Sequence, residues 1–219
     1  MGLEIPKATE LEKLVFGIKN EKELGLIALQ VYHFQYNNNP VYQEYCNITG
    51  RVPEAIKSVS DIPFLPISFF KTHKVISTSF KPQFVFKSSG TTGNETSCHF
   101  IKDASIYITS FNKTFQQFYN NPEQYCIVGL LPSYLERGNS SLVFMVNSLI
   151  QNSNYPESGF YLYDYEKLHK VLETVEAKSI PTILFGVTYA LLEFSNAFNI
   201  QLKYTTIIET GGMKGRGRE

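Results

Sequence analysis

Two kinds of hydrophobic pattern follow one another along this chain. From residue 7 to about residue 48, apolar residues recur every three or four positions, the spacing of one helix face. The clearest run consists of Leu24, Ile27, Val31 and Phe34. Asn37-Asn38-Asn39-Pro40 interrupts it, and a shorter helix is predicted to end near Gly50. We therefore predict a helical segment over residues 1–60, followed by a proline-containing extended connector at 61–70 that packs on a core.

From residue 83 onward, short apolar runs alternate with helical patterns. The predicted strands are residues 84–87, 97–101, 124–131, 159–163, 182–185 and 205–209. Helices are predicted between them, capped by Asp103, by Ser140 or Ser141, and by Asp164. Such alternation is typical of βαβ units. We therefore expect an α/β domain over residues 61–219, with a largely parallel sheet flanked by helices.

Three polar motifs are expected at the carboxyl edge of this sheet, where folds of this kind bind their ligands. They are the loop after Lys87, the Pro132-Ser133-Tyr134 turn after Leu131, and Gly211-Gly212 after Glu209. Because the carboxyl ends of parallel strands share one edge, we expect these motifs to converge on one site.

Composition narrows the class of partner. The 20 basic and 20 acidic side chains cancel, so no overall field attracts nucleic acids or acidic membranes. The longest apolar runs are far shorter than a membrane span, and the charged first thirty residues are unlike a signal peptide. Cys46, Cys98 and Cys126 are an odd number without metal-ligand spacing, so we predict no metal site and interpret them as free thiols of a cytoplasmic protein. The 17 Phe and 14 Tyr residues fit an aromatic core, an acyl-binding cavity, or both.

The loop Ser88-Ser89-Gly90-Thr91-Thr92-Gly93 carries the clearest chemistry. Glycines allow the backbone N–H groups to turn inward, and serine and threonine add hydroxyl donors, so the array suits phosphate oxygens. It matches neither the P-loop nor the dinucleotide-binding pattern. The alternative is an ordinary turn between two strands, although a two-residue turn would suffice for that. Cys98 and His99 are excluded as a nucleophile and its base, because neighbouring strand residues point to opposite faces.

In this loop the chain resembles the phosphate-binding signature of the adenylate-forming superfamily, which includes acyl-CoA synthetases, luciferases and adenylation domains. Three further stretches narrow the resemblance: residues 62–71, residues 131–137 with Ser140-Ser141, and residues 209–216. Their order is similar to that of the acyl-protein synthetase branch, whose best-known member is the LuxE component of bacterial bioluminescence. The resemblance covers the chain from about Ile62 to its last residue.

The resemblance implies an activity. Such enzymes use ATP and Mg²⁺ to convert a fatty or related carboxylic acid into acyl-AMP, then pass the acyl group to a protein thiol. An acyl-reductase or a carrier protein is the implied partner. The stretch Thr182–Thr188 also resembles a superfamily strand and turn, but a buried strand explains it and we assign it no contact.

The resemblance also implies roles for individual residues. Ser88, Ser89, Gly90, Thr91, Thr92 and Gly93 would bind the ATP phosphates. The lysine that commonly follows this loop is missing, and His99 is either an additional phosphate ligand or a structural residue. Ser133, Tyr134 and Arg137 would belong to the acyl and carboxylate pocket, unless they are only packed or solvated. Gly211 and Gly212 would lie against adenine.

Later superfamily motifs, including the acyl-accepting cysteine and the C-terminal domain with its catalytic lysine, have no equivalent in these 219 residues. We therefore expect the chain to be the N-terminal part of such an enzyme, whether truncated, a fragment or a natural half, with weak or no activity by itself. Two alternatives stay open: a phenylacetate-type acyl-CoA ligase, and a non-catalytic nucleotide- or carrier-binding module.

Overall fold

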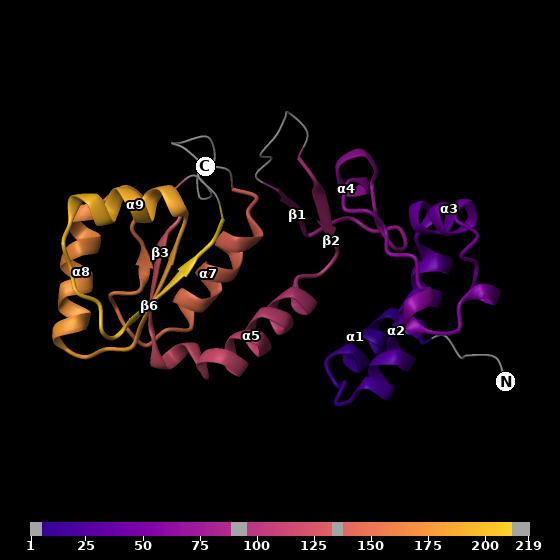
Figure 1. The fold of residues 1–219 in the computed structure, drawn as a ribbon, viewed down its shortest axis with the longest axis horizontal. Coiled ribbons are helices and arrows are strands. Elements are labelled where there is room, and N and C mark those ends of the chain that lie inside the picture. Colours follow the sequence, from indigo (N-terminus) through magenta and orange to yellow (C-terminus); the bar gives the residue numbers. More distant parts are fainter. Residues whose placement is uncertain (1–5, 89–95, 133–137, 212–219) are drawn as a thin grey trace. The chain divides into compact units, whose positions relative to one another are not determined.

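The computed structural model describes residues 6–88, 96–132 and 138–211. The chain divides into two compact units, Met1–Ile106 and Tyr107–Glu219, which are called the first and the second unit below (Figure 1). The boundary predicted after residue 60 stays a prediction.

The first unit begins with three helices, α1 (Ala8–Val15), α2 (Glu21–Asn38) and α3 (Pro40–Ile48). Asn20 caps α2 and Asn39 caps α3, where each side chain accepts a backbone N–H from the first turn. The predicted helical segment is therefore confirmed. Pro40 starts α3, since the first helical position needs no N–H donor.

The buried face of α2 agrees only in part with the predicted one. Ile27 is buried as predicted, and Tyr32, with 2% of its surface exposed, packs in a small core with Tyr42, Cys46 and Ile56. Leu24, however, is 49% exposed. The prediction of a single Leu24–Phe34 stripe was wrong at Leu24, because aromatic contacts from α3 select a different side of the helix.

Short elements connect these helices to a hairpin. They are η1 (Pro53–Ala55), η2 (Val59–Asp61) and α4 (Phe69–Thr72). Of the connector between η2 and α4, Ile62 and Leu65 pack on the small core, as predicted. Phe64 and Ile67 do not, since each is 75% exposed.

Strands β1 (Phe84–Lys87) and β2 (Cys98–Ile101) form a separate two-stranded antiparallel sheet. The loop after Lys87 therefore connects a hairpin, and the expectation that it follows a strand of the parallel sheet was wrong. The reason is the length of the connection. Only ten residues separate the strands, whereas parallel strands need a longer crossover, usually a helix.

The second unit contains the parallel sheet. Its strand order is β4-β3-β5-β6, with β3 (Cys126–Leu130), β4 (Gly159–Phe160), β5 (Thr182–Gly186) and β6 (Thr205–Glu209). Every neighbouring pair is parallel. All residues of β3 and β5 are buried, as expected for central strands covered on both faces. The α/β prediction is confirmed.

Helices cover both faces of this sheet (Figure 1). They are α5 (Ser105–Tyr119), α7 (Ser141–Gln151), α8 (Tyr165–Ala177) and α9 (Thr188–Ala197), and η3 (Pro122–Gln124) precedes β3. The Tyr107 hydroxyl on α5 donates to the Ser141 carbonyl at the start of α7. On the other side, α8 and α9 meet where Tyr165 packs edge-on against Phe194.

The predicted helix caps are confirmed. Ser140 accepts the Val143 N–H and Asp164 accepts the Lys167 N–H, while the Asp103 carboxylate accepts the Ser105 N–H at the start of α5. These caps satisfy N–H groups that have no partner inside a helix.

Candidate functional site

The order of the strands indicates where a ligand would bind on the parallel sheet. The chain runs from β3 outward through α7 to β4, then returns through α8 to β5 and continues through α9 to β6. The connections that follow β3 and β5 therefore diverge to opposite sides of the sheet. In doubly wound folds the ligand lies at such a divergence, outside the carboxyl ends of the two strands. This point is the candidate site of the second unit.

The described residues on one side of the divergence are those that directly follow β3 and those that directly precede α7. Leu131 is fully buried and Pro132 is buried, and Ser140 caps α7 at the far end of the loop. Between them lie the predicted acyl-pocket residues Ser133, Tyr134 and Arg137, which are outside the described residues.

The ends of β5 and β6 lie on the other side of the divergence. The Thr188 hydroxyl, in the first turn of α9, donates to a Glu209 carboxylate oxygen at the end of β6. The Thr210 N–H donates to the Gly186 carbonyl over 2.9 Å. These two contacts join the carboxyl ends of β5 and β6. The Glu209 side chain remains exposed at the surface.

Sequence reasoning assigned no contact to Thr188. It counted Glu209 as the end of a strand and the start of the stretch 209–216, and it gave the Glu209 side chain no role. Their positions along the chain could have indicated both residues. Each is a polar residue at the carboxyl end of a strand, and the two strands are neighbours in the sheet.

Gly211 follows directly, with φ at +64°. A residue with a side chain rarely adopts this conformation, so this turn favours glycine. The structure thus places one of the two predicted adenine-binding glycines at the carboxyl edge, while Gly212 lies outside the described residues.

An apolar cavity of about 490 Å³ lies between α9 and the β5–β6 face. Leu184, Leu191, Phe194, Phe198 and Ile207 contribute to its lining, and Glu209 is the charged residue among the described lining residues. A lining of this kind suits an apolar group.

The first unit carries the predicted phosphate loop. Ser88 lies at the neck of the loop, where its N–H donates to the Ser97 carbonyl over 3.1 Å and its hydroxyl oxygen accepts the Ser97 N–H over 3.0 Å. Ser89, Gly90, Thr91, Thr92 and Gly93 lie outside the described residues. Ser88 therefore has a structural role at the neck, whatever else its hydroxyl hydrogen contacts.

His99 has a packing partner. Its ring stacks on Phe70, with 4.7 Å between the ring centroids and 19° between the planes. This contact fits the structural interpretation of His99. His99 pairs with Phe86 and Cys98 pairs with Lys87, so the two neighbours face opposite sides of the hairpin as predicted.

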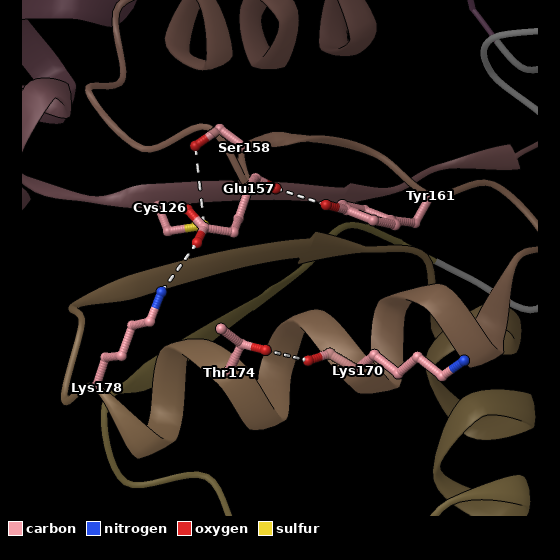
Figure 2. A network of polar contacts seen from close by, with 7 residues as sticks. All are labelled: Cys126, Glu157, Ser158, Tyr161, Lys170, Thr174 and Lys178. Carbon is pink, nitrogen blue, oxygen red and sulfur yellow. Dashed lines mark hydrogen bonds and ion pairs between the residues drawn. The ribbon is translucent and has the colours of Figure 1, made fainter.

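The remaining two cysteines, Cys46 and Cys126, are buried. At the amino end of β3, far from the candidate site, Cys126 is fully buried beside Ser158 in a polar network with Glu157 and Lys178 (Figure 2). Burial raises the pKa of the Cys126 thiol to about 11, and burial likewise raises that of Cys46. A thiol with a raised pKa carries little thiolate at neutral pH, so neither is suited to accept an acyl group.

Two further properties concern the described ranges alone. Within residues 6–88, 96–132 and 138–211, no cluster of three or more His, Cys, Asp or Glu side chains is arranged to hold a metal ion. None of the helices in those ranges combines the length and apolarity needed to cross a bilayer.

Comparison with known proteins adds the identity of the family. No curated protein matches the chain. No solved structure matches it either. One family model does match, described as acyl-protein synthetase, LuxE, and it covers residues 18–219, which include the second unit and the first unit from residue 18 onward. The chain therefore belongs to the LuxE acyl-protein synthetase family.

Proposed function

We propose that this chain serves an ATP-dependent acyl-protein synthetase, which activates a fatty or related carboxylic acid as acyl-AMP and transfers the acyl group to a protein thiol. The observation that carries this proposal is the family match over residues 18–219. Two features of the chain support it: the divergence between β3 and β5, and the hydroxyl- and glycine-rich sequence of residues 88–93.

The reaction would proceed in two displacements. A carboxylate oxygen of the acid attacks the α-phosphorus of ATP, the bond to the β-phosphate oxygen breaks, and pyrophosphate leaves. The thiolate of the acceptor then attacks the carbonyl carbon of the acyl-AMP, and AMP leaves with the electron pair of the broken bond. Both leaving groups are phosphates, so the site needs donors that follow negative charge as it develops.

Residues 88–93 would provide such donors through their backbone N–H groups and hydroxyls. Gly211 and Gly212 would lie against the adenine, since a residue without a side chain lets a flat ring approach the backbone closely. Ser133, Tyr134 and Arg137 would contact the acyl group and its carboxylate.

Mg²⁺ would be held mainly by the phosphates of the nucleotide, because this ion keeps several waters and uses one or two carboxylates at most. Glu209 fits that requirement as an exposed carboxylate at the carboxyl edge of the sheet. When bound, Mg²⁺ would neutralise part of the charge on the leaving pyrophosphate.

The proposal is tested by carboxylate-dependent exchange of labelled pyrophosphate into ATP, measured with Mg²⁺ across a ladder of fatty acids. Because weak or no activity is expected of these 219 residues by themselves, the assay is run on this chain and on a version extended by downstream coding sequence, if one exists. Adenylation predicts exchange that depends on the acid. A second assay offers coenzyme A or a protein thiol as acceptor, which separates an acyl-CoA ligase from an acyl-protein synthetase. A folded protein that binds no ATP and supports no exchange would contradict the proposal and favour a non-catalytic binding module.

The matched variant is Thr92→Val with Gly93→Ala, which removes a hydroxyl donor and the freedom of a glycine from the loop. Loss of one preorganised donor typically costs about a hundredfold or more in rate. We expect at least this loss of exchange, while the melting temperature stays within a few degrees. Unchanged exchange would mean that residues 88–93 do not bind the phosphates.

A further inference from the structure

The two edges of the parallel sheet in the second unit differ. Among the described strands, β4 lies at one edge and has two residues, whereas β6 lies at the other edge and has five. Shortness protects an edge strand from pairing with another chain, and so does a proline, a lysine or a bulge. Residues 205–209 contain neither proline nor lysine, and they pair with β5 without a bulge. The β6 edge is therefore suited to accept a further strand.

The hydrogen bonds to β5 show which backbone groups of β6 face outward. The Thr182 N–H donates to the Tyr204 carbonyl over 2.9 Å, and the Thr210 N–H donates to the Gly186 carbonyl over 2.9 Å. Because the backbone groups of successive strand residues point alternately to the two sides, the even-numbered residues of β6 face β5. The N–H and C=O groups of the odd-numbered residues, with Ile207 at the centre, point away from β5.

Exposed apolar side chains lie beside these outward-facing groups. Ile207 is 49% exposed, and Leu192 on α9 is 48% exposed. Both line the apolar cavity between α9 and the β5–β6 face, so this cavity is open to solvent next to β6. Apolar surface next to the unpaired backbone of an edge strand is typical of an interaction surface.

We propose that β6 pairs antiparallel with β6 of a second copy of this chain, about a two-fold axis that passes beside Ile207. The inference does not depend on the proposed function. Ile207 is the middle residue of β6, so this register pairs the two strands over their whole length. Residues that pair across antiparallel strands share a face, so the apolar side chains on the α9 side of both copies adjoin. A two-fold contact of this kind uses the same surface twice and closes after two copies.

The charges are compatible with this contact. The chain has a formal net charge of zero, so no overall repulsion separates two copies. In the proposed register Glu209 lies opposite the partner's Thr205, and the two Glu209 side chains lie at opposite ends of the paired strands. The partner's Lys203 is then a diagonal neighbour of Glu209, within reach of a long side chain. Lys203 is exposed, just before β6.

The test is sedimentation velocity of the full chain over a range of protein concentrations, which measures the dissociation constant of the dimer. Ile207→Pro removes the central outward N–H, and proline is tolerated on an edge strand where its nitrogen faces outward. Ile207→Val keeps the N–H and a β-branched side chain. Ile207→Lys has a matched control in Leu26→Lys on α2, since Leu26 is 53% exposed. Circular dichroism establishes that each variant is folded.

We expect the parent to dimerise, and Ile207→Pro and Ile207→Lys each to raise the dissociation constant about tenfold or more, because the change lies at the centre of the contact. Ile207→Val and Leu26→Lys should dimerise nearly as the parent does. Hydrogen exchange measured by NMR is an independent readout. Protection of the Ile207 amide should increase with protein concentration, whereas the Ile208 amide, which faces β5, should be protected at every concentration.

Three results would overturn the inference. One is a folded parent that stays monomeric at every concentration. Another is a dimer that the Ile207 variants do not weaken, because the contact would then lie elsewhere. The third is an Ile207 amide that is protected in the monomer, which would assign the edge to a strand of the same polypeptide. These measurements contain no nucleotide or acid, so the proposed function stands or falls separately.

Discussion

The Ser158 hydroxyl provides a hydrogen-bond acceptor for a backbone N–H of β3. The Ser158 side-chain oxygen accepts the Ile127 N–H over 2.9 Å, one residue before β4 begins to pair with β3. It also lies 2.7 Å from the oxygen of Ser153, and the Ser153 hydroxyl group donates to the Tyr125 carbonyl. Ile127 is fully buried, so its N–H has no access to water. The sequence pattern predicted the strand but contained no sign of this bond.

Ser158→Ala should destabilise the second unit by about 1–3 kcal/mol, because it leaves a buried N–H without an acceptor. Urea unfolding at neutral pH measures the change. Ser195→Ala on α9 is the control, since this serine is exposed and the expected effect is within about 0.5 kcal/mol. Equal effects of the two substitutions would show that the Ser158 bond adds nothing to stability.

Glu176 at the end of α8 holds the turn that precedes β6. Its carboxylate accepts the Lys203 N–H over 2.8 Å, the Thr205 hydroxyl over 2.7 Å and the Tyr204 N–H over 3.1 Å. Burial by itself would raise the pKa of Glu176, but these hydrogen bonds outweigh it and the net pKa lies below the usual value. The charged form is therefore the one that stabilises the fold.

The contribution of Glu176 to the free energy of unfolding depends on pH. A carboxylate whose pKa is lower in the folded state contributes stability that is fully present above its unfolded pKa of about 4.3, and this contribution is lost as the pH falls through the folded pKa. Glu176→Gln should thus cost about 1–3 kcal/mol at pH 7. The difference from the parent should shrink as the pH is lowered from about 4.3.

Urea unfolding of both proteins across this pH range measures the effect. Glu173→Gln on the same helix is the control, because Glu173 is 60% exposed and its ion pair with His169 spans 3.5 Å at the surface. Such pairs contribute little. A difference between Glu176→Gln and the parent that stays constant with pH would contradict the assignment.

At the scale of elements, the last residue of β5, Gly186, lies close to the Leu191 side chain at the start of α9. A side chain at Gly186 would place its Cβ 2.5 Å from Leu191 Cγ, which lies in the first turn of α9. The absence of a side chain at Gly186 therefore lets α9 begin directly against the strand. The start of α9 determines where Thr188 lies, and therefore its hydrogen bond to Glu209 at the candidate site.

Gly186→Ala should destabilise the protein by about 1–3 kcal/mol, the usual cost of overpacking, and shift α9. Adding Leu191→Ala makes room, so the double variant should lose less than the sum of the two single losses. Thermal unfolding of the four proteins in this cycle gives the coupling energy. Gly159→Ala is the control, since no atom lies within 4 Å of the Cβ position there. Strict additivity would show that the two residues do not compete for space.

The elements themselves were largely predictable. The segments 84–87 and 205–209 were predicted to the residue. The other strands differ from their predictions at the ends, because apolar runs continue into buried turns such as Leu131. Ser140 and Asp164 were predicted as caps, since capping depends on neighbours in the chain. The antiparallel pairing of β1 with β2 was missed because alternation of polarity along a strand is the same in both directions of pairing.

At the scale of the whole molecule, the sequence by itself determined the family, the α/β class and the approximate positions of the helices and strands. These properties depend on local spacing and on ordered motifs. Only the tertiary structure decided that the hairpin is separate from the parallel sheet and that Thr188 meets Glu209. Each of these joins residues distant in the chain, and such contacts are set by strand order and side-chain packing, which no periodicity along a single segment encodes.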